Sequence, residues 1–481
     1  MAQTETYSQI KQKSIVSTVS LFIQSGYSAF LGLVANLVVT IILSPKIFGI
    51  YITTLSIISV LNYFSDIGLA ASLVQKKEVT KDDIKTTFTI QQILIISIIG
   101  IGFILTNFIK TFYKLPTEGI TLYWALLIAF FISSLKTIPS IFLERKIQFQ
   151  KIVFVQMIEN TIFYLTVILF AFLKFGLLSF AIAVLLRAFV GLVVIYSISF
   201  WIPKIGISSK SLKKLLSFGL PFQASSFLAL FKDDLIILFL GKILGFEALG
   251  YIGWAKKWAE APIRIIMDNI SRVLFPVFAR IQNNKEKVAH LVEKIIQYQT
   301  SLLTPIILGM ALIMDKVVFI IPKYGKWAPA IPLFYLFCIS AFFSSYSSPF
   351  INLFNALGYA KIPFIFMTIW TISTWILTPL LTKLFGIYGF PITIVIMSVS
   401  SIFVMLKAKQ IVKFDLIGSV YKPILSTIIM GISVSIILLF VQNPYLAIIL
   451  SFIFGSTIYF FSMKNIFNIN LITELKTLIK K

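Results

Sequence analysis

Seven charged residues lie close together in an otherwise apolar stretch, residues 250–282, and the basic ones could bind an anion. They are Lys256, Lys257, Glu260, Arg264, Asp268, Arg272 and Arg280. At about 100° per residue of an α-helix, all except Arg280 fall on one face. Ammonium and guanidinium groups bind anionic oxygens through charge-assisted hydrogen bonds. We therefore predict that Lys256, Lys257, Arg264 and Arg272 form a basic wall that receives an anionic ligand.

The same spacing supports a second interpretation, in which the charges mainly pair with one another. Glu260, Arg264, Asp268 and Arg272 follow at intervals of four residues, which is the spacing of ion pairs along a helix. Such pairs would only satisfy a hydrated groove, and a third interpretation is a helix at the membrane interface. The four basic and two acidic residues on this face leave a charge of +2, which favours an anionic ligand.

This split into a charged and an apolar face fits a membrane, because the composition is that of an integral membrane protein. Hydrophobic residues make up 58% of the chain and charged residues 12%, whereas soluble domains hold about 25% charged residues. The apolar runs are continuous rather than alternating, which favours spanning helices over a barrel. We expect lipid to contact the apolar face of the stretch, which carries Ala255, Trp258, Ala259, Pro262, Ile266, Ile270, Val273 and Val277.

The apolar runs predict an all-α protein with about fourteen transmembrane helices. They cover residues 14–43, 47–74, 86–108, 120–142, 152–173, 177–200, 215–240, 249–279, 291–314, 329–356, 363–383, 387–407, 423–441 and 445–463. Every second loop, together with both ends of the chain, carries 25 lysines and arginines, and the other loops carry 9. Because basic residues gather on the cytoplasmic side, both termini are predicted to be cytoplasmic.

Two short matches indicate an internal repeat. LSPKIFGIY at 43–51 matches LGFEALGYI at 244–252, and FGLLSF at 175–180 matches FGIYGF at 385–390. Both pairs fall in outer loops between corresponding helices. The repeat predicts two six-helix lobes in a pseudo-twofold arrangement, 1–205 and 206–410, with two further helices and a cytoplasmic tail in 411–481. The tail, 465–481, has the spacing of a helix on the inner leaflet, and a solvated tail is the equal alternative.

Charges inside the predicted spans should line a shared interior, because a charge facing lipid at the bilayer centre costs at least about 2.5 kcal/mol. Outside the 250–282 stretch they are Asp66, Lys136, Glu159, Arg187, Lys232, Asp233 and Asp234. We predict Arg187 to be a further cavity residue that faces the basic wall, or a partner of Glu159 or Asp66.

Five acidic residues are candidates for coupling or gating. Asp233 and Asp234 could bind a coupling ion, or form an interfacial cluster at the outer end of their helix. Asp66 could act as a gate, or as a structural cap near the inner end of the second helix. The other two are Glu260 and Asp268 of the charged stretch.

Several runs of the sequence resemble the Wzx-type polysaccharide flippases. They are FSDIGLAASLVQKKEVTKDDIKTTF at 64–88, FLERKIQFQKI at 142–152, LLSFGLPFQASSFL at 215–228 and the run at 240–282. This is the polysaccharide transporter family of the multidrug/oligosaccharidyl-lipid/polysaccharide superfamily, and the likeness is closest to its colanic-acid and teichuronic-acid exporter branch. The resemblance implies a bacterial inner-membrane protein that moves an undecaprenyl-pyrophosphate-linked oligosaccharide to the outer leaflet. Its implied partners are that substrate, membrane lipids and polysaccharide assembly proteins, without nucleic acid.

We therefore expect a flippase that works by alternating access, with the pyrophosphate on the basic wall. A cation or drug antiporter of the same superfamily is one alternative and should have a net acidic cavity. A membrane-embedded polymerase or ligase is another and should have long outer loops. One histidine, one cysteine and the lack of a phosphate-binding glycine loop argue against an enzyme. No cofactor is predicted, and a coupling ion, H⁺ or Na⁺, stays open.

Overall fold

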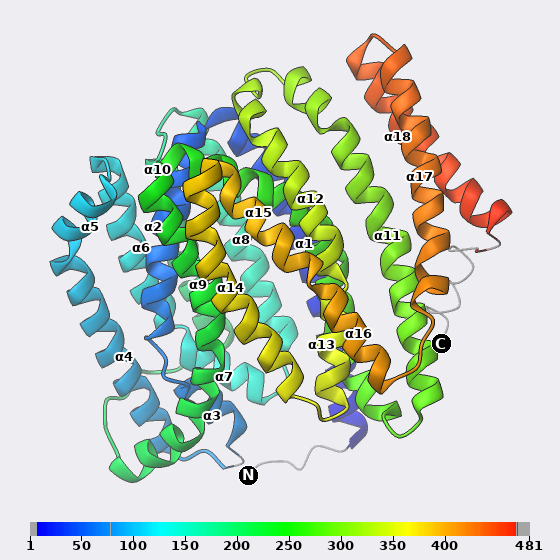
Figure 1. The fold of residues 1–481 in the computed structure, drawn as a ribbon. Helices are drawn as coiled ribbons and strands as arrows, with labels where there is room; N and C mark the ends of the chain where they lie inside the picture. Colours follow the sequence, from blue (N-terminus) through cyan, green and yellow to red (C-terminus); the bar gives the residue numbers. More distant parts are fainter. Residues whose placement is uncertain (1–6, 77, 468, 470–481) are drawn as a thin grey trace. The chain divides into compact units, whose positions relative to one another are not determined.

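The computed structural model describes residues 7–76, 78–467 and 469 (Figure 1). Within them it describes the backbone alone at residues 7–19, 22, 221, 222, 224–229, 268, 269, 272, 273, 275 and 276. Every regular element in this part of the chain is helical, as the sequence predicts. The chain forms two units, unit 1 (1–250) and unit 2 (251–481). The predicted lobe boundaries at 205 and 410 stay a prediction.

Unit 1 holds nine helices and the beginning of a tenth, all within the described residues. Helices α8 and α9 pack together, α1 lies against α8, and α6 contacts α2, α4 and α9. The bounds are α1 (Tyr7–Ile42), α2 (Pro45–Tyr63), α3 (Leu69–Gln75), α4 (Lys81–Ile104), α5 (Thr106–Tyr113), α6 (Thr117–Ser134), α7 (Thr137–Arg145), α8 (Phe149–Phe172), α9 (Leu178–Ile198) and α10 (Ser209–Ile281), which continues into unit 2.

Unit 2 begins inside α10 and is built around α11, which packs against α12, α17 and α18. Helices α17 and α18, orange to red in Figure 1, lie side by side. The bounds are α11 (Lys285–Ile320), η1 (Gly325–Ala330), α12 (Ile331–Ser345), α13 (Ser347–Ala356), α14 (Lys361–Phe385), η2 (Gly386–Tyr388), α15 (Gly389–Val399), α16 (Ser401–Ile411), α17 (Leu416–Phe440), α18 (Pro444–Phe461) and η3 (Ser462–Ile466).

The described residues contain 12 segments that are long and apolar enough to span a membrane. The predicted number of about fourteen is not confirmed by this number. Two of the 12 are much longer than one bilayer crossing, with 38 residues at Leu230–Met267 and 51 at Lys361–Ile411. The first contains a kink at Gly245, whose φ is 80°, and the second contains η2. Each overlaps two of the predicted helices.

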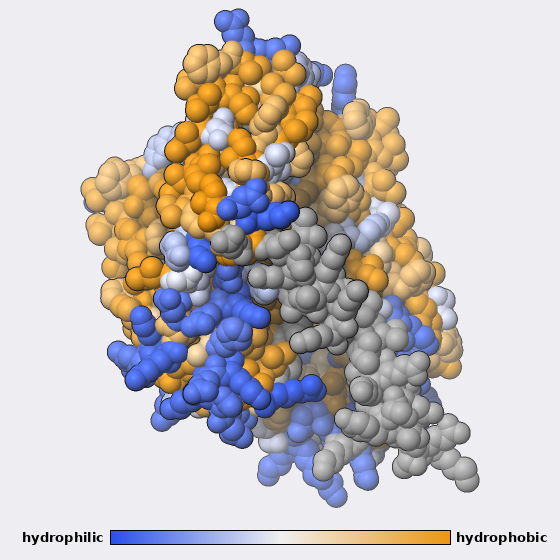
Figure 2. Space-filling view, turned by 90° about the vertical axis from the view of Figure 1, so that its right-hand side faces the viewer, coloured by the Kyte–Doolittle hydropathy of each residue, from blue (hydrophilic) through white to orange (hydrophobic). Residues whose placement is uncertain are grey.

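The surface has the polarity of a protein that lies in lipid. On the face shown in Figure 2, hydrophobic residues cover a broad area, and hydrophilic residues gather towards one end. Large apolar side chains are exposed on many helices, for example Phe364 (63%), Phe452 (75%) and Phe189 (57%). Apolar side chains this exposed are favourable only where the solvent is hydrocarbon.

The predicted helix 47–74 is wrong in one respect, because it is two helices. Helix α2 ends at Tyr63 and α3 begins at Leu69. The carboxylate of Asp66 accepts hydrogen bonds from the N–H groups of Leu69 (2.8 Å) and Ala70 (3.2 Å). These bonds cap the new helix, and Gly68 supplies the left-handed turn before it, with φ of 80°. Asp66 therefore lies in a helix break and not within a span.

Two glycines matched by the internal repeat make reciprocal close contacts within unit 1. A Cβ atom on Gly49 would overlap the carbonyl oxygen of Phe246, and one on Gly250 would overlap that of Pro45. The offset of 201 residues that relates Gly49 to Gly250 also relates Pro45 to Phe246. The first turn of α2 and the matching turn of α10 therefore cross at backbone distance, which only glycine permits.

Candidate functional site

Unit 1 contains an open polar cavity between α2, α4, α6, α8 and α9. Its volume is about 520 Å³, and a second hollow of about 810 Å³ shares Asp66, Ser133, Lys136 and Thr137 with it. We call the two together the unit-1 cavity. Its charged lining residues are Asp66, Lys136, Glu144, Glu159 and Arg187. A charged cavity inside a bundle with an apolar surface can hold a polar ligand away from lipid.

Glu159 is the centre of a charged triad in this cavity. It stands on α8, it is 7% exposed, and it forms an ion pair with Lys136. Arg187 on α9 lies with its Nε 3.9 Å from Glu159 Oε2. Lys136 reaches Glu159 from the break between α6 and α7, where the helix direction changes. Three segments distant in sequence thus supply one buried carboxylate and two cations.

The triad answers one open question about Arg187. Of the partners that the sequence offered, the structure pairs Arg187 with Glu159. Lys136 and Glu159 were recognised in the sequence as intramembrane charges but not as site residues. The signal was there, since each is a charge in an apolar run, but their pairing depends on how three helices pack.

Asp66 lines the same cavity and also caps α3. Burial raises the pKa of its carboxyl above the usual value, and the two hydrogen bonds that backbone N–H groups of α3 donate to it oppose that shift. Glu144, at the end of α7, also has a raised pKa because it is buried. Burial therefore shifts the titration of two of the three acids in the unit-1 cavity towards higher pH.

The charged face of α10 lies in unit 2, and there Glu260 forms ion pairs with Lys256 and Arg264. Glu260 Oε2 accepts a hydrogen bond of 3.0 Å from Arg264, and Glu260 Oε1 lies 3.8 Å from Lys256 Nζ. The Arg264 side chain is nevertheless 64% exposed, so most of it is accessible to a ligand. Lys257 follows on the same helix and is half-buried. The side chains of Asp268 and Arg272 lie outside the described residues.

The apolar face of this helix does not behave as predicted. Ala255 and Ala259, expected to face lipid, are at most 1% exposed. Their neighbour Trp254 stacks on Trp327 with ring centroids 5.6 Å apart and donates a 2.8 Å hydrogen bond to the hydroxyl of Tyr324. This part of α10 is thus packed against other protein segments rather than against lipid. The Trp254 indole N–H finds there a hydrogen-bond acceptor that hydrocarbon would not supply.

The structure does not bring all candidates together. Asp233 is exposed and Asp234 is half-buried on the unit-1 part of α10, and neither lines the unit-1 cavity. Their proposed roles in ion coupling stay a prediction.

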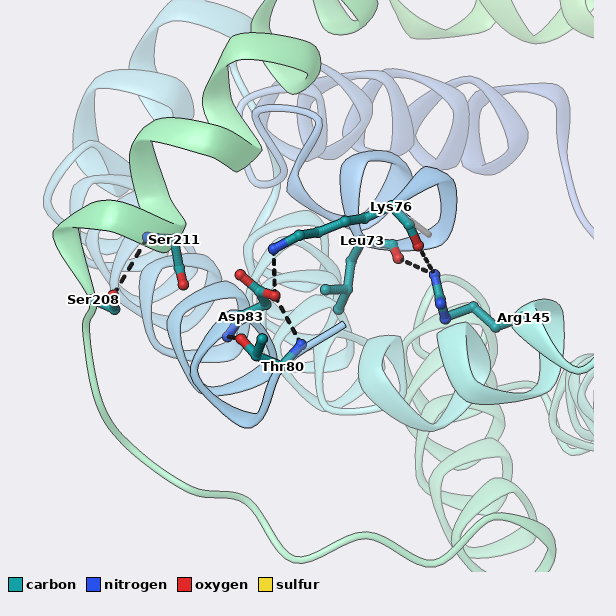
Figure 3. A network of polar contacts seen from close by, with 7 residues as sticks. All are labelled: Leu73, Lys76, Thr80, Asp83, Arg145, Ser208 and Ser211. Atoms are coloured by element: carbon teal, nitrogen blue, oxygen red, sulfur yellow. Dashed lines mark hydrogen bonds and ion pairs between the residues drawn. The ribbon is translucent and has the colours of Figure 1, made fainter. Parts of the chain in front are cut away.

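A hydrogen-bonded clasp joins the runs at 64–88 and 142–152 beside the cavity (Figure 3). Arg145 Nη1 donates to the carbonyl oxygens of Leu73 (2.8 Å), Val74 (3.0 Å) and Lys76 (2.6 Å) at the end of α3. Lys76 also pairs with Asp83 at 2.5 Å. The N–H of Asp83 donates to Thr80 Oγ1 and the N–H of Thr80 donates to Asp83 Oδ2, which makes a capping box at the start of α4. The clasp fixes the segment that carries Asp66.

Comparison with known proteins gives one family and several relatives. Residues 38–332 match the family model described as polysaccharide biosynthesis protein. The chain is 27% identical over 393 residues to the lipopolysaccharide biosynthesis protein WzxC of Escherichia coli (strain K12), which covers 78% of this chain and 77% of the relative. It is 23% identical over 338 residues to the succinoglycan biosynthesis transport protein ExoT of Rhizobium meliloti (strain 1021), covering 69% and 67%.

Two solved structures share the fold. The lipid II flippase MurJ in an inward closed conformation superposes with a TM-score of 0.74 at 15% identity, over 94% of this chain and 99% of that one. An inward-facing multidrug resistance MATE family transporter of the MOP superfamily gives 0.63 at 15% identity, over 82% and 97%. At this level of identity the likeness concerns the fold alone.

Proposed function

Because the chain belongs to the polysaccharide biosynthesis protein family, we propose that it is a flippase for an undecaprenyl-pyrophosphate-linked oligosaccharide in the bacterial inner membrane. The observation that carries this proposal is the basic face of α10, where Lys256 and Arg264 form ion pairs with one described acid, Glu260, and Lys257 adds a third basic residue. Relatives named for polysaccharide biosynthesis and transport, and a flippase with the same fold, support it.

The proposed mechanism uses the charges to hold the head group while the lipid tail stays in the bilayer. Phosphate oxygens compete with Glu260 for the guanidinium of Arg264, which can bind two oxygens at once. The two predicted lobes alternate between inward and outward access around the polar interior. Direct contacts to the sugars come from neutral polar side chains, such as those of the unit-1 cavity.

Several finer properties belong to the same proposal. Both termini lie in the cytoplasm, as the loop charges predict. The protein transports without catalysing a covalent step, and H⁺ or Na⁺ is the candidate coupling ion, with Asp66, Glu260, Asp268, Asp233 and Asp234 as candidates to bind it or gate the path. Polysaccharide assembly proteins are its expected partners.

One observation favours a second function, a cation or drug antiporter. The unit-1 cavity contains the acids Asp66, Glu144 and Glu159 beside only two basic residues, Lys136 and Arg187. Such a transporter would bind a cation there, and loss of the protein would reduce efflux without affecting surface polysaccharide.

The test is deletion of the gene with complementation by variants. We expect deletion to accumulate lipid-linked oligosaccharide on the cytoplasmic face. The measurement is the fraction of this lipid that an added glycosidase can reach in membrane vesicles of known orientation. Arg264→Gln should restore export poorly, whereas Arg280→Gln, an exposed arginine on the same helix outside the charged face, should restore it fully. Reduced drug efflux without this accumulation would refute the flippase in favour of the antiporter.

A further inference from the structure

The buried triad of the unit-1 cavity presents its cations, and not its carboxylate, to an incoming ligand. The side chain of Glu159 is 9% exposed, compared with 16% for Lys136 and 44% for Arg187. An anion that enters the cavity therefore meets the guanidinium group first. A triad that served only to join helices would have no reason to expose its arginine in this way.

Arg187 is attracted to Glu159 but is not hydrogen-bonded to it. The separation of 3.9 Å between Nε and Oε2 exceeds hydrogen-bond distance. A guanidinium has five N–H donors, so this contact leaves donors for an anion. Its carbon lies 5.7 Å from the ring centroid of Phe163, a cation–π contact that steadies the group without using its donors.

A glycine makes room for the carboxylate of Glu159. A Cβ atom on Gly191 of α9 would overlap Glu159 Oε1. The carboxylate is therefore pressed against the backbone of α9, one turn beyond Arg187. Ser133, Thr137 and Gln91, which carry hydroxyl and amide groups, line the same cavity.

We propose that Lys136 and Arg187 form an anion-binding site for the phosphate-bearing head group in addition to the basic face of α10, and that Glu159 occupies this site as an internal anion until the ligand displaces it. This inference rests on the proposed function, because it takes the pyrophosphate of the lipid-linked substrate as the ligand. Two cations beside the same carboxylate repel each other, so the carboxylate between them stabilises the empty state. A pyrophosphate carries more charge than one carboxylate and can replace it.

The consequence is that Glu159 weakens binding and thereby permits release. The triad has a charge of +1, and removing the carboxylate charge raises it to +2. Coupling free energies between two binding events on one protein change affinity by about 5- to 150-fold, and we take this range as the scale of the effect. A site that bound the head group with both cations unopposed would hold it too tightly to turn over.

The experiment measures binding to the purified full-length protein in detergent, with thermal stabilisation as the readout. One arm uses inorganic pyrophosphate and the other uses undecaprenyl pyrophosphate. Glu159→Gln, which keeps the size of the side chain, is expected to bind both at least about tenfold more tightly than the wild type. Lys136→Gln and Arg187→Gln should bind both about tenfold more weakly. Glu118→Gln, an exposed acid on α6, is the matched control and should bind as the wild type does.

A second variant moves the carboxylate without removing it. Gly191→Ala is expected to displace the Glu159 carboxylate from its position against α9. Like Glu159→Gln, it should therefore bind both pyrophosphate ligands more tightly than the wild type. Unchanged or weaker binding by Glu159→Gln would overturn the proposal, and so would wild-type binding by Lys136→Gln and Arg187→Gln. If Glu159→Gln bound inorganic pyrophosphate more tightly but not undecaprenyl pyrophosphate, the proposal would also be overturned. The site would then be one for free pyrophosphate and not for the lipid head group.

The proposal and the function can fail separately. If deletion blocks export but these variants bind pyrophosphate as the wild type does, the flippase stands and the triad is structural. If deletion leaves export intact, the proposed function fails whatever the variants bind.

Discussion

Arg145→Gln is expected to loosen α3, the short helix whose first turn is capped by Asp66. Arg145 Nη1 lies 2.8, 3.0 and 2.6 Å from the carbonyl oxygens of Leu73, Val74 and Lys76 (Figure 3). Helix α3 has 7 residues, too few to be stable without such contacts. The positive charge also lies at the helix C-terminus, where the helix dipole favours it.

The magnitude follows from the number of donors. One Nη1 nitrogen carries two N–H groups, so at most two of the three bonds are well formed at a time. A hydrogen bond to a charged group contributes about 1.5–3 kcal/mol. Because Arg145 is only half-buried, water replaces part of the loss, and we take the lower end, about 3 kcal/mol in total. This corresponds to roughly 100-fold more frequent opening of α3.

The assay is hydrogen exchange of the α3 amides in the purified protein, under conditions where exchange reports the opening equilibrium. Arg145→Gln should speed exchange over Leu69–Gln75 while leaving α17 and α18 unchanged. Lys146→Gln, which alters the adjacent exposed lysine, is the control and should leave exchange unchanged. If α3 exchanges at the wild-type rate in Arg145→Gln, the clasp does not stabilise α3 and our reasoning about it is refuted.

Two further predictions concern the close helix crossing and the capping acid. Gly49→Leu should destabilise the protein by about 1–3 kcal/mol, because the new side chain overlaps the Phe246 carbonyl. Gly100→Leu is the control and should not destabilise it, since a Cβ there meets nothing within 4 Å. Equal melting temperatures of the two variants would contradict this prediction. Burial raises the pKa of Asp66 above its usual 3.8, so the folded state binds the proton more tightly and stability falls as pH rises from 3.8 through the raised pKa. Asp66→Asn keeps the cap and should remove that fall, seen as a flatter plot of Tm against pH; an unchanged slope would show that Asp66 is not its source.

Prediction from the sequence worked best where the signal is local. Continuous apolar runs are sufficient to identify spanning helices, because a helix satisfies its own backbone in hydrocarbon. It failed at 64–68, where the helix breaks inside the predicted span 47–74. That break depends on one carboxylate turning back to cap the next helix, which an average over many residues does not register.

The candidate site divides in the same way. The charges on α10 were visible as a face, and the spacing of four residues gave the pairing of Glu260 with Arg264. The ion pair of Glu260 with Lys256 was found only in the structure. Which of the three interpretations describes their function stays a prediction. The expected exposure of Ala255 and Ala259 to lipid was wrong, because periodicity shows that a face is apolar but not what covers it.

The sequence by itself determined that this is a helical membrane protein, which family it resembles and which charges the membrane must accommodate. These follow from composition, hydropathy and short motifs, all of which are properties of neighbouring residues. Only the tertiary structure decided that Lys136, Glu159 and Arg187 meet, and that Gly191 leaves room for their carboxylate. Residues on separate helices come into contact only through packing, and packing depends on the whole bundle rather than on any one stretch of sequence.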